Sequence, residues 1–254
     1  TGYEDMSAWK EFAPHNKNIR IEGIDILKDY VLLELRRNGL SEIVAKPISG
    51  DMDKIIDFPE PVYSATLSGN PEYDSNTFRY SYTSLNRPTT LYEYDIVTET
   101  IVKLKEQEVP SGFNPEDYTV ERIWATAKDG VEVPMALVYK KGLKKDGTNP
   151  ALIYSYGSYG MSSDVYFSAS IYSLIDRGFV YAIAQIRGGS DLGEQWYEDG
   201  KLLNKKNSFT DFISCSEKLI SDGYTSSNKL AAMGGSAGGL LMGAVVNSRP
   251  DLYQ

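Results

Sequence analysis

Cysteine and histidine are almost absent from this 254-residue sequence, which has only Cys215 and His15. A single cysteine excludes any disulfide within the chain and fits a reducing compartment. One cysteine and one histidine cannot form a zinc or iron site of the usual kinds, so we expect no metal and no other cofactor. Cys215 lies in DFISCSEKLI, whose spacing predicts an amphipathic helix, and we interpret it as a small buried residue rather than a reactive thiol.

Long hydrophobic runs are also missing. The longest, such as residues 179–186, are far shorter than the roughly 20 residues that a membrane span needs. The first residues, TGYEDMSAWKEFAP, lack a basic patch followed by an apolar stretch and do not resemble a signal peptide. We therefore expect a cytoplasmic protein that does not contact a membrane. Because the sequence does not begin with Met, a removed signal and a periplasmic location stay open as the alternative.

Basic residues are in the minority, and the formal net charge is −9. Binding to nucleic acid is driven mainly by Lys and Arg, so this balance argues against a nucleic-acid partner. We interpret the negative net charge mainly as a means of keeping the protein soluble through repulsion between like charges. A second interpretation is that it favours cationic substrates. The hydrophobic content of 41% supplies a normal globular core, and nothing in the sequence fixes an oligomeric state.

Short β-runs make up the sequence from residue 20 to about residue 108. The pair Asn38-Gly39 stands between two alternating runs, which is a strong hairpin signal. A comparable unit has Asn86 about 48 residues after Asn38, and this period is typical of β-propeller blades. So few blades cannot close a ring and would leave strand edges unpaired. We therefore expect part of a propeller, with further blades in front of it.

The pattern changes after a turn-rich segment at 109–118, which predicts a linker. A hairpin is expected about Asp129-Gly130, and strands then alternate with helices. Buried strands are predicted at 151–157, 179–186 and 229–234, and helices at 162–178, 207–224 and 237–251. This alternation is typical of a parallel α/β sheet with right-handed crossovers.

The pentapeptide Gly234-Gly235-Ser236-Ala237-Gly238 matches G-x-S-x-G and stands between a predicted strand and a predicted helix. Such a turn is so sharp that the residues two before and two after the serine must lack bulk, which explains the glycines. The helix N-terminus would direct the Ala237 amide at an oxyanion. We therefore predict Ser236 as a catalytic nucleophile. The alternative is a glycine-rich turn that only packs tightly or holds a phosphate.

Nucleotide-binding motifs do not fit this region. The glycines around Ser236 miss the G-x-G-x-x-G spacing, and no G-K-[ST] follows them. A second glycine-rich loop, IRGGSDLG at 186–193, follows a buried strand at the edge where α/β proteins bind ligands. This loop is either part of the site or an ordinary tight turn.

Four motifs in order resemble the prolyl oligopeptidase family of serine peptidases, and most of all its oligopeptidase B branch. They are LIYSYGSYG at 152–160, IRGGSDLGEQWYEDGKLLNKKN at 186–207, GGSAGGLLMG at 234–243 and NSRPDLY at 247–253. The resemblance is dense over about the last 145 residues and only architectural before them. It implies the C-terminal blades of a β-propeller domain at 1–112 and the N-terminal part of an α/β-hydrolase domain at 113–254.

The resemblance also assigns roles to individual residues. In the family, a tyrosine at the end of the first buried strand donates its hydroxyl to the oxyanion, and the matching residue here is Tyr156. Ser155 stands where glycine is commoner in the family. The candidate catalytic residues are therefore Ser236, Tyr156 and Ala237.

The acid and base of the catalytic triad are not visible. In α/β-hydrolases the chain order is Ser, then Asp or Glu, then His, and no histidine follows Ser236. His15 precedes it in the propeller-like half, so we do not expect it to be the base. We expect a fragment truncated at both ends, with the triad Asp and His and the specificity carboxylates beyond Gln254. An unactivated serine is a weak nucleophile, so we expect this chain alone to be inactive.

The resemblance implies cleavage of short peptides after Arg or Lys through an acyl-enzyme, with the propeller as a steric filter. Three alternatives stay open. The first is a prolyl or acylaminoacyl peptidase of the same family. The second is a carboxylesterase of the same fold, although YSYGSYG stands where such enzymes have an H-G-G-G-type loop. The third is a non-catalytic interaction protein with a propeller and a hydrolase-like half.

Overall fold

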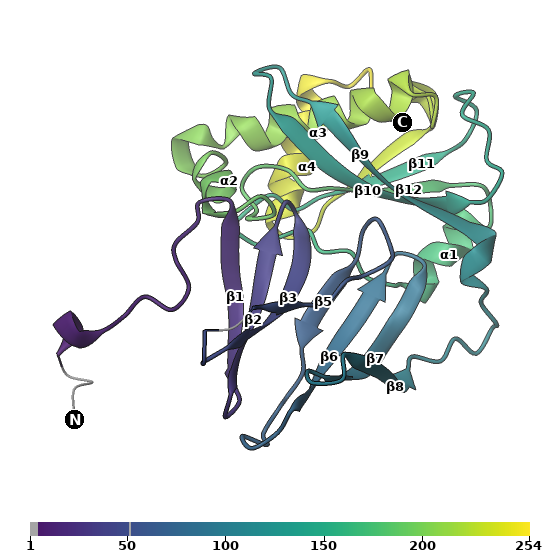
Figure 1. Cartoon of the computed structure of the whole chain (residues 1–254). Helices are drawn as coiled ribbons and strands as arrows, with labels where there is room; N and C mark the ends of the chain where they lie inside the picture. The colour runs from purple at the N-terminus through teal and green to yellow at the C-terminus, as the bar shows by residue number, and fades with distance from the viewer. Residues whose placement is uncertain (1–4, 51) are drawn as a thin grey trace.

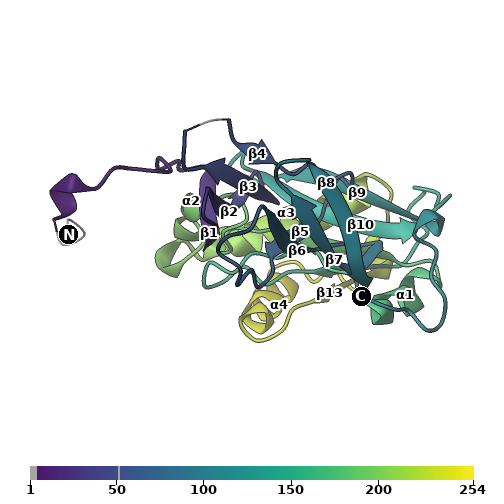
Figure 2. The same ribbon diagram turned by 60° about the horizontal axis from the view of Figure 1, so that its bottom comes forward.

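Two small antiparallel sheets and one larger mixed sheet make up the protein (Figure 1). We analysed a computed structural model, which describes residues 5–50 and 52–254. Figure 1 shows the two small sheets next to each other on one side of the larger sheet. Both views show the 3-10 turn at Met6–Ala8 lying away from the sheets (Figure 1, Figure 2), whereas Ala13, later in the same segment, packs against the first small sheet.

Each small sheet has four strands that follow one another in sequence order. The first sheet comprises β1 (Ile19–Ile26), β2 (Tyr30–Arg37), β3 (Leu40–Pro47) and β4 (Lys54–Ile55). The second comprises β5 (Ser64–Leu67), β6 (Thr77–Ser84), β7 (Arg87–Asp95) and β8 (Thr100–Glu106). The predicted hairpin is confirmed, because Asn38 and Gly39 join β2 to β3 with φ values of 52° and 76°. Four-stranded antiparallel units of this kind are the blades of propellers.

A shared apolar core joins the two small sheets. Phe78, Tyr80 and Tyr82 alternate along β6 and therefore lie on one face of the strand. They are buried in one cluster with Leu32 and Ile43 of the first sheet. The blades therefore pack face to face.

The larger sheet has five strands in the order β13-β11-β12-β10-β9. They are β9 (Tyr118–Thr126), β10 (Glu132–Lys140), β11 (Ala151–Tyr154), β12 (Val180–Ala184) and β13 (Leu230–Met233). The predicted parallel pairing is confirmed for β11 with β12 and with β13, whereas β9 and β10 form the antiparallel hairpin expected about Asp129-Gly130. Tyr154 is opposite both Ile183 and Met233, so the carboxyl ends of the three parallel strands are level.

Helices cover both faces of the larger sheet. They are α1 (Ala169–Ile175), α2 (Glu194–Glu198), α3 (Lys206–Ser221) and α4 (Ala237–Ser248), with short 3-10 turns at Met6–Ala8, Pro115–Asp117, Leu202–Asn204 and Ser227–Lys229. On one face Phe212 of α3 and Leu241 of α4 join the main core. On the other face Tyr172 of α1 is buried together with Leu85 from the second small sheet.

Helix α1 is shorter than the predicted helix at 162–178. Ser168 has extended backbone angles, and the helix starts only after it. Phe167 precedes the helix, and its amide donates a hydrogen bond to the Thr83 hydroxyl of the second small sheet at 3.1 Å. This contact with a blade keeps the segment extended, and a local pattern cannot reveal it. Helix α2 directly follows the glycine-rich loop at 186–193 and was not predicted.

The predicted linker runs from β8 to β9 and contains the 3-10 turn at Pro115–Asp117. A domain boundary between residues 112 and 113 stays a prediction. Among residues 5–50 and 52–254, no helix combines the length and the apolar character needed to cross a membrane.

Candidate active site

The turn between β13 and α4 exposes Ser236 at the carboxyl edge of the parallel strands. Ser236 has φ 53° and ψ −119°, a region that residues with a Cβ atom rarely occupy. A strained serine between a strand and a helix is the geometry of a nucleophile elbow. The elbow predicted from G-x-S-x-G is therefore formed by the backbone.

Glycines make this turn sterically feasible. A Cβ atom on Gly234 would lie 2.5 Å from the Gly238 carbonyl oxygen, closer than atoms can approach. A Cβ atom on Gly238 would lie 3.0 Å from the Ser155 carbonyl oxygen. Gly235 has open space around it. The close approach of strand and helix thus requires two of these glycines and not the third.

The first amide of α4 is available to a ligand. Gly238 donates its amide to the Gly235 carbonyl at 2.7 Å, whereas the Ala237 amide has no hydrogen bond to another described residue. Free amides at a helix N-terminus carry partial positive charge and bind anions. Ala237 can therefore donate to an oxyanion formed next to Ser236.

Tyr156 lies beside the elbow, two residues beyond the end of β11. The Cβ position on Gly238 is 3.8 Å from Tyr156 Cδ2, so the ring lies against the first turn of α4. Tyr156 is half-buried, and its ring centroid is 6.4 Å from that of Tyr159. The structure therefore brings the three candidate residues, Ser236, Ala237 and Tyr156, into one region.

Ser155 does not divert the backbone from this arrangement. Its amide donates to the Met233 carbonyl at 3.3 Å, which extends the pairing of β11 with β13. Its hydroxyl donates to the Ala184 carbonyl at 2.7 Å, and the residue is fully buried. The serine therefore ties the strand that precedes Tyr156 to both neighbouring strands.

The glycine-rich loop at 186–193 supports the segment that follows Tyr156. Gly188 packs so tightly that a Cβ atom there would lie 2.1 Å from the Gly157 carbonyl oxygen. The Lys205 ammonium group donates to that same carbonyl and, at 2.9 Å, to the Ser158 hydroxyl. Burial lowers the pKa of Lys205. This loop is thus adjacent to the site, and its glycines serve packing.

A buried ion pair anchors the loop to α3. Arg187 Nε and Nη2 donate to the two carboxylate oxygens of Asp211 at 2.9 and 2.6 Å, and Asp211 is fully buried. Arg187 Nη1 donates to Asp129 at 2.6 Å. Burial alone would lower the pKa of Arg187, but the two carboxylates raise it overall. This pair was not predicted from the sequence, although Asp211 lies on the apolar face of a predicted helix.

Asp191 is a second buried acid that sequence reasoning missed. One of its carboxylate oxygens accepts the Ser163 amide at 2.8 Å, and the other has no partner among the described residues. Burial raises its pKa to about 7, although Arg36 opposes the shift. Asp191 therefore links the glycine-rich loop to the chain that leads away from Tyr156.

His15 and Cys215 lie outside the site. His15 belongs to the N-terminal segment and borders a groove over β1–β3, which no residue of the elbow lines. Cys215 is completely buried in α3, and burial raises the pKa of its thiol well above the ordinary value. The interpretation of Cys215 as a buried structural residue is confirmed.

Family models match both halves of the chain. The model of the prolyl oligopeptidase N-terminal β-propeller domain matches residues 2–107, and that of the prolyl oligopeptidase family matches residues 165–254. These matches confirm a partial propeller followed by part of an α/β-hydrolase domain.

Curated proteins and solved structures agree with this assignment. Dipeptidyl aminopeptidase BI of Pseudoxanthomonas mexicana is 45% identical over 97% of the chain, and Protease 2 of Moraxella lacunata is 38% identical over 98%. The matches cover 34% and 36% of these relatives, so the chain spans about a third of their length. Oligopeptidase B from Leishmania major is 40% identical with a TM-score of 0.88, over 94% of this chain and 35% of its own. The chain therefore belongs to the prolyl oligopeptidase family.

Proposed function

We propose that this chain carries the nucleophile and the oxyanion donors of a serine oligopeptidase that cleaves short peptides through an acyl-enzyme. Ser236 attacks the scissile carbonyl. The Ala237 amide and the Tyr156 hydroxyl donate hydrogen bonds to the carbonyl oxygen, on which negative charge develops. The observation that carries the proposal is the strained, exposed Ser236 beside Tyr156. Residues 1–112 are proposed to belong to the propeller domain and 113–254 to the hydrolase domain, in a cytoplasmic protein.

The triad acid and base are proposed to come from a longer polypeptide that contains this chain. The single histidine, His15, borders the groove over β1–β3 and not the elbow. A serine hydroxyl without a base attacks carbonyls poorly. We therefore expect negligible peptidase turnover by the purified 254-residue chain and activity in the longer protein.

Two measurements test the nucleophile and one of the oxyanion donors. A fluorophosphonate probe should label the longer protein, and Ser236→Ala should abolish labelling while the melting temperature stays unchanged. Tyr156→Phe should lower kcat by about 100-fold to 1000-fold with a smaller effect on KM. Labelling that survives Ser236→Ala, or turnover by the 254-residue chain alone, would contradict the proposal.

We propose a preference for Arg or Lys on the acyl side of the cleaved bond. The support is the similarity to Protease 2 and to oligopeptidase B. Relatives called dipeptidyl aminopeptidase and prolyl endopeptidase make cleavage after other residues the alternative. Fluorogenic substrates that differ only in Arg, Lys, Pro or Ala at this position, together with an ester, would decide between them. A higher kcat/KM for Pro or Ala than for Arg and Lys would overturn the preference.

A further inference from the structure

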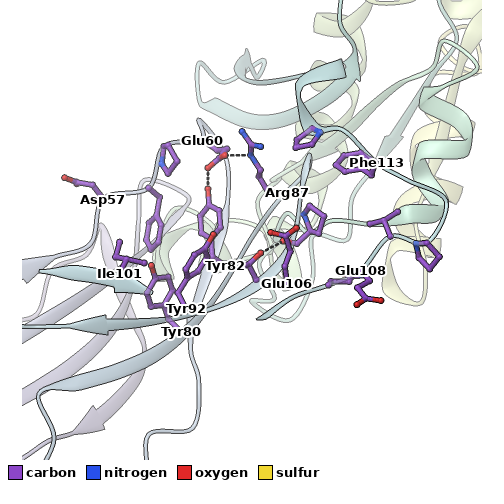
Figure 3. A pocket seen from close by; sticks show the side chains of 18 residues that line it. Asp57, Glu60, Tyr80, Tyr82, Arg87, Tyr92, Ile101, Glu106, Glu108 and Phe113 are labelled. Carbon is purple, nitrogen blue, oxygen red and sulfur yellow. Dashed lines mark hydrogen bonds and ion pairs between the residues drawn. The ribbon is translucent and has the colours of Figure 1, made fainter. Parts of the chain in front are cut away.

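A cavity of about 830 Å³ lies between the second small sheet and the linker (Figure 3). Its walls come from the segment before β5, from β6, β7 and β8, and from residues 107–115 of the linker. This volume is in the range of pockets that bind small molecules or a few peptide residues. None of the three candidate catalytic residues lines it. The cavity is therefore a separate feature of the molecule.

The charged side chains that line the cavity are mainly acidic. Four carboxylates and one guanidinium contribute a formal charge of −3; they are Asp57, Glu60, Glu106, Glu108 and Arg87. Arg87 is already paired, because it donates to Glu60 at 2.6 Å and to Glu116 at 3.2 Å. Asp57 and Glu108 are exposed and form no ion pair with another described residue. The cavity therefore has unneutralised negative charge.

Aromatic rings form the inner wall of the cavity, where Tyr80, Tyr82 and Tyr92 lie next to one another in Figure 3. Tyr80 and Tyr92 stack with ring centroids 5.5 Å apart and planes at 23°, and Phe58 stacks on Tyr82 at 5.1 Å and 15°. Faces of aromatic rings attract cations. The wall thus combines flat apolar surfaces with an electrostatic preference for positive charge.

One hydroxyl in this wall has no partner. Tyr80 is 2% exposed and forms no side-chain hydrogen bond to another described residue, but its oxygen is not one of the fully buried unpaired atoms, so it is accessible from the cavity. The Tyr82 hydroxyl, by contrast, donates to Glu60. A phenol oxygen that is accessible and unpaired can accept a hydrogen bond from a ligand. Tyr80 therefore offers an acceptor at the base of the cavity.

We propose that this cavity binds the arginine side chain of a peptide, at a site separate from Ser236. A guanidinium group is planar and positively charged, so it stacks on aromatic rings while its N–H groups donate to carboxylates and to the Tyr80 oxygen. A phosphate or another anion would be repelled by the unpaired carboxylates of Asp57 and Glu108, since Glu60 and Glu106 are paired with Arg87 and Lys103. The proposal does not depend on the proposed peptidase function.

The first test compares two peptides that differ only in charge. The Ser236→Ala chain is used because it cannot form an acyl-enzyme. Calorimetric titration should show that it binds acetyl-Ala-Arg-Ala-amide and that it binds the citrulline analogue at least tenfold more weakly. Binding should weaken between 0.05 and 0.5 M salt, because exposed charges are screened. Equal affinity for the two peptides, or no binding at 10 mM of either, would overturn the proposal.

The second test locates the site with matched variants. Asp57→Asn and Glu108→Gln should each weaken the arginine peptide by about 2-fold to 5-fold, the usual range for an exposed ion pair. Tyr80→Phe should also weaken it, and the melting temperature will show whether each variant is folded. Glu72→Gln is the control, because Glu72 is exposed in the loop between β5 and β6 of the same sheet and does not line the cavity. Affinity that falls no further in the cavity variants than in the control would refute the site.

Discussion

At the scale of single residues, Ser236 illustrates how a strained conformation is maintained by its neighbours. Its left-handed backbone is unfavourable by itself, by roughly 1–3 kcal/mol. The pairing of β13 with β11 fixes the chain before it, and α4 fixes the chain after it. The strain is therefore sustained by two regular elements, and it keeps the hydroxyl exposed.

The two glycines before Ser236 should respond very differently to an added methyl group. Gly234→Ala brings a Cβ atom within 2.5 Å of the Gly238 carbonyl oxygen, so strand and helix must move apart. We expect a loss of about 1–3 kcal/mol in the free energy of unfolding, as for other overpacked sites. Gly235→Ala is the control, because nothing lies within 4 Å of its Cβ position. Urea denaturation of both variants would test this, and equal stabilities would count against the tight elbow.

Asp191 should make stability depend on pH. Its carboxyl loses its proton near pH 3.8 in the unfolded chain and near pH 7 in the folded one. Between these values the folded state binds more protons, so this group lowers stability as pH rises and has no further effect above about pH 7. Asp191→Asn keeps an acceptor for the Ser163 amide and removes the titratable carboxyl group. The charged groups that act on Asp191, Arg36 and Asp164, are unchanged in this variant.

The expected result for Asp191→Asn is a gain in melting temperature over the parent chain that is larger at pH 8 than at pH 5. Melting curves of both proteins across this range would measure it. A difference that does not change with pH would show that Asp191 does not titrate in this range and would contradict the prediction.

At the scale of secondary structure, local signals were sufficient for many elements. The Asn38-Gly39 and Asp129-Gly130 turns, the buried parallel strands and the elbow depend on residues within a few positions of one another, and all of them formed as predicted. The late start of α1 and the pairing of Arg187 with Asp211 were not predictable in this way. They depend on partners 84 and 24 residues away in the sequence, which only the fold brings together.

The attachment of the glycine-rich loop to α3 should be sensitive to loss of the Asp211 charge. Asp211→Asn leaves Arg187 buried with only Asp129 as a charged partner, and breaking a buried pair is strongly destabilising. We expect a loss of about 3 kcal/mol in the free energy of unfolding. Asp222→Asn is the control in the same helix region, since Asp222 forms an exposed pair with Lys218 that is expected to contribute less than about 0.5 kcal/mol. Similar losses in urea denaturation would contradict a structural role for the buried pair.

At the scale of the whole molecule, one hairpin turn of each small sheet contacts the hydrolase part: the β2–β3 turn and the β6–β7 turn. Arg122 of β9 donates to the Asn38 carbonyl at the first turn. Tyr172 of α1 donates to the Leu85 carbonyl at the second turn, at 2.7 Å. These contacts involve backbone carbonyls, so the sequence gives no sign of them. They join the blades to the larger sheet independently of the linker.

Removing one of these contacts should weaken the whole molecule. Tyr172→Phe leaves the buried Leu85 carbonyl without its donor, which should cost about 1–2 kcal/mol. Tyr166→Phe is the control, because Tyr166 is 57% exposed and should change stability by less than about 0.5 kcal/mol. We expect one cooperative urea transition that moves to lower concentration for Tyr172→Phe. Two separate transitions in the parent chain would show that the blades and the hydrolase part unfold independently.

The level carboxyl ends of β11, β12 and β13 limit where the chain can change in length. Tyr154 and Met233 are paired across β11 and β13, which fixes the register of the two strands. Tyr156 follows Tyr154 by two residues, and Ser236 follows Met233 by three. Inserting or deleting one residue within β11 or β13 would turn the later side chains of that strand to the opposite face and displace Tyr156 or Ser236. The connections at 157–179 and 185–229 have no such constraint from strand pairing. Length variation that preserves the site should therefore be confined to these connections.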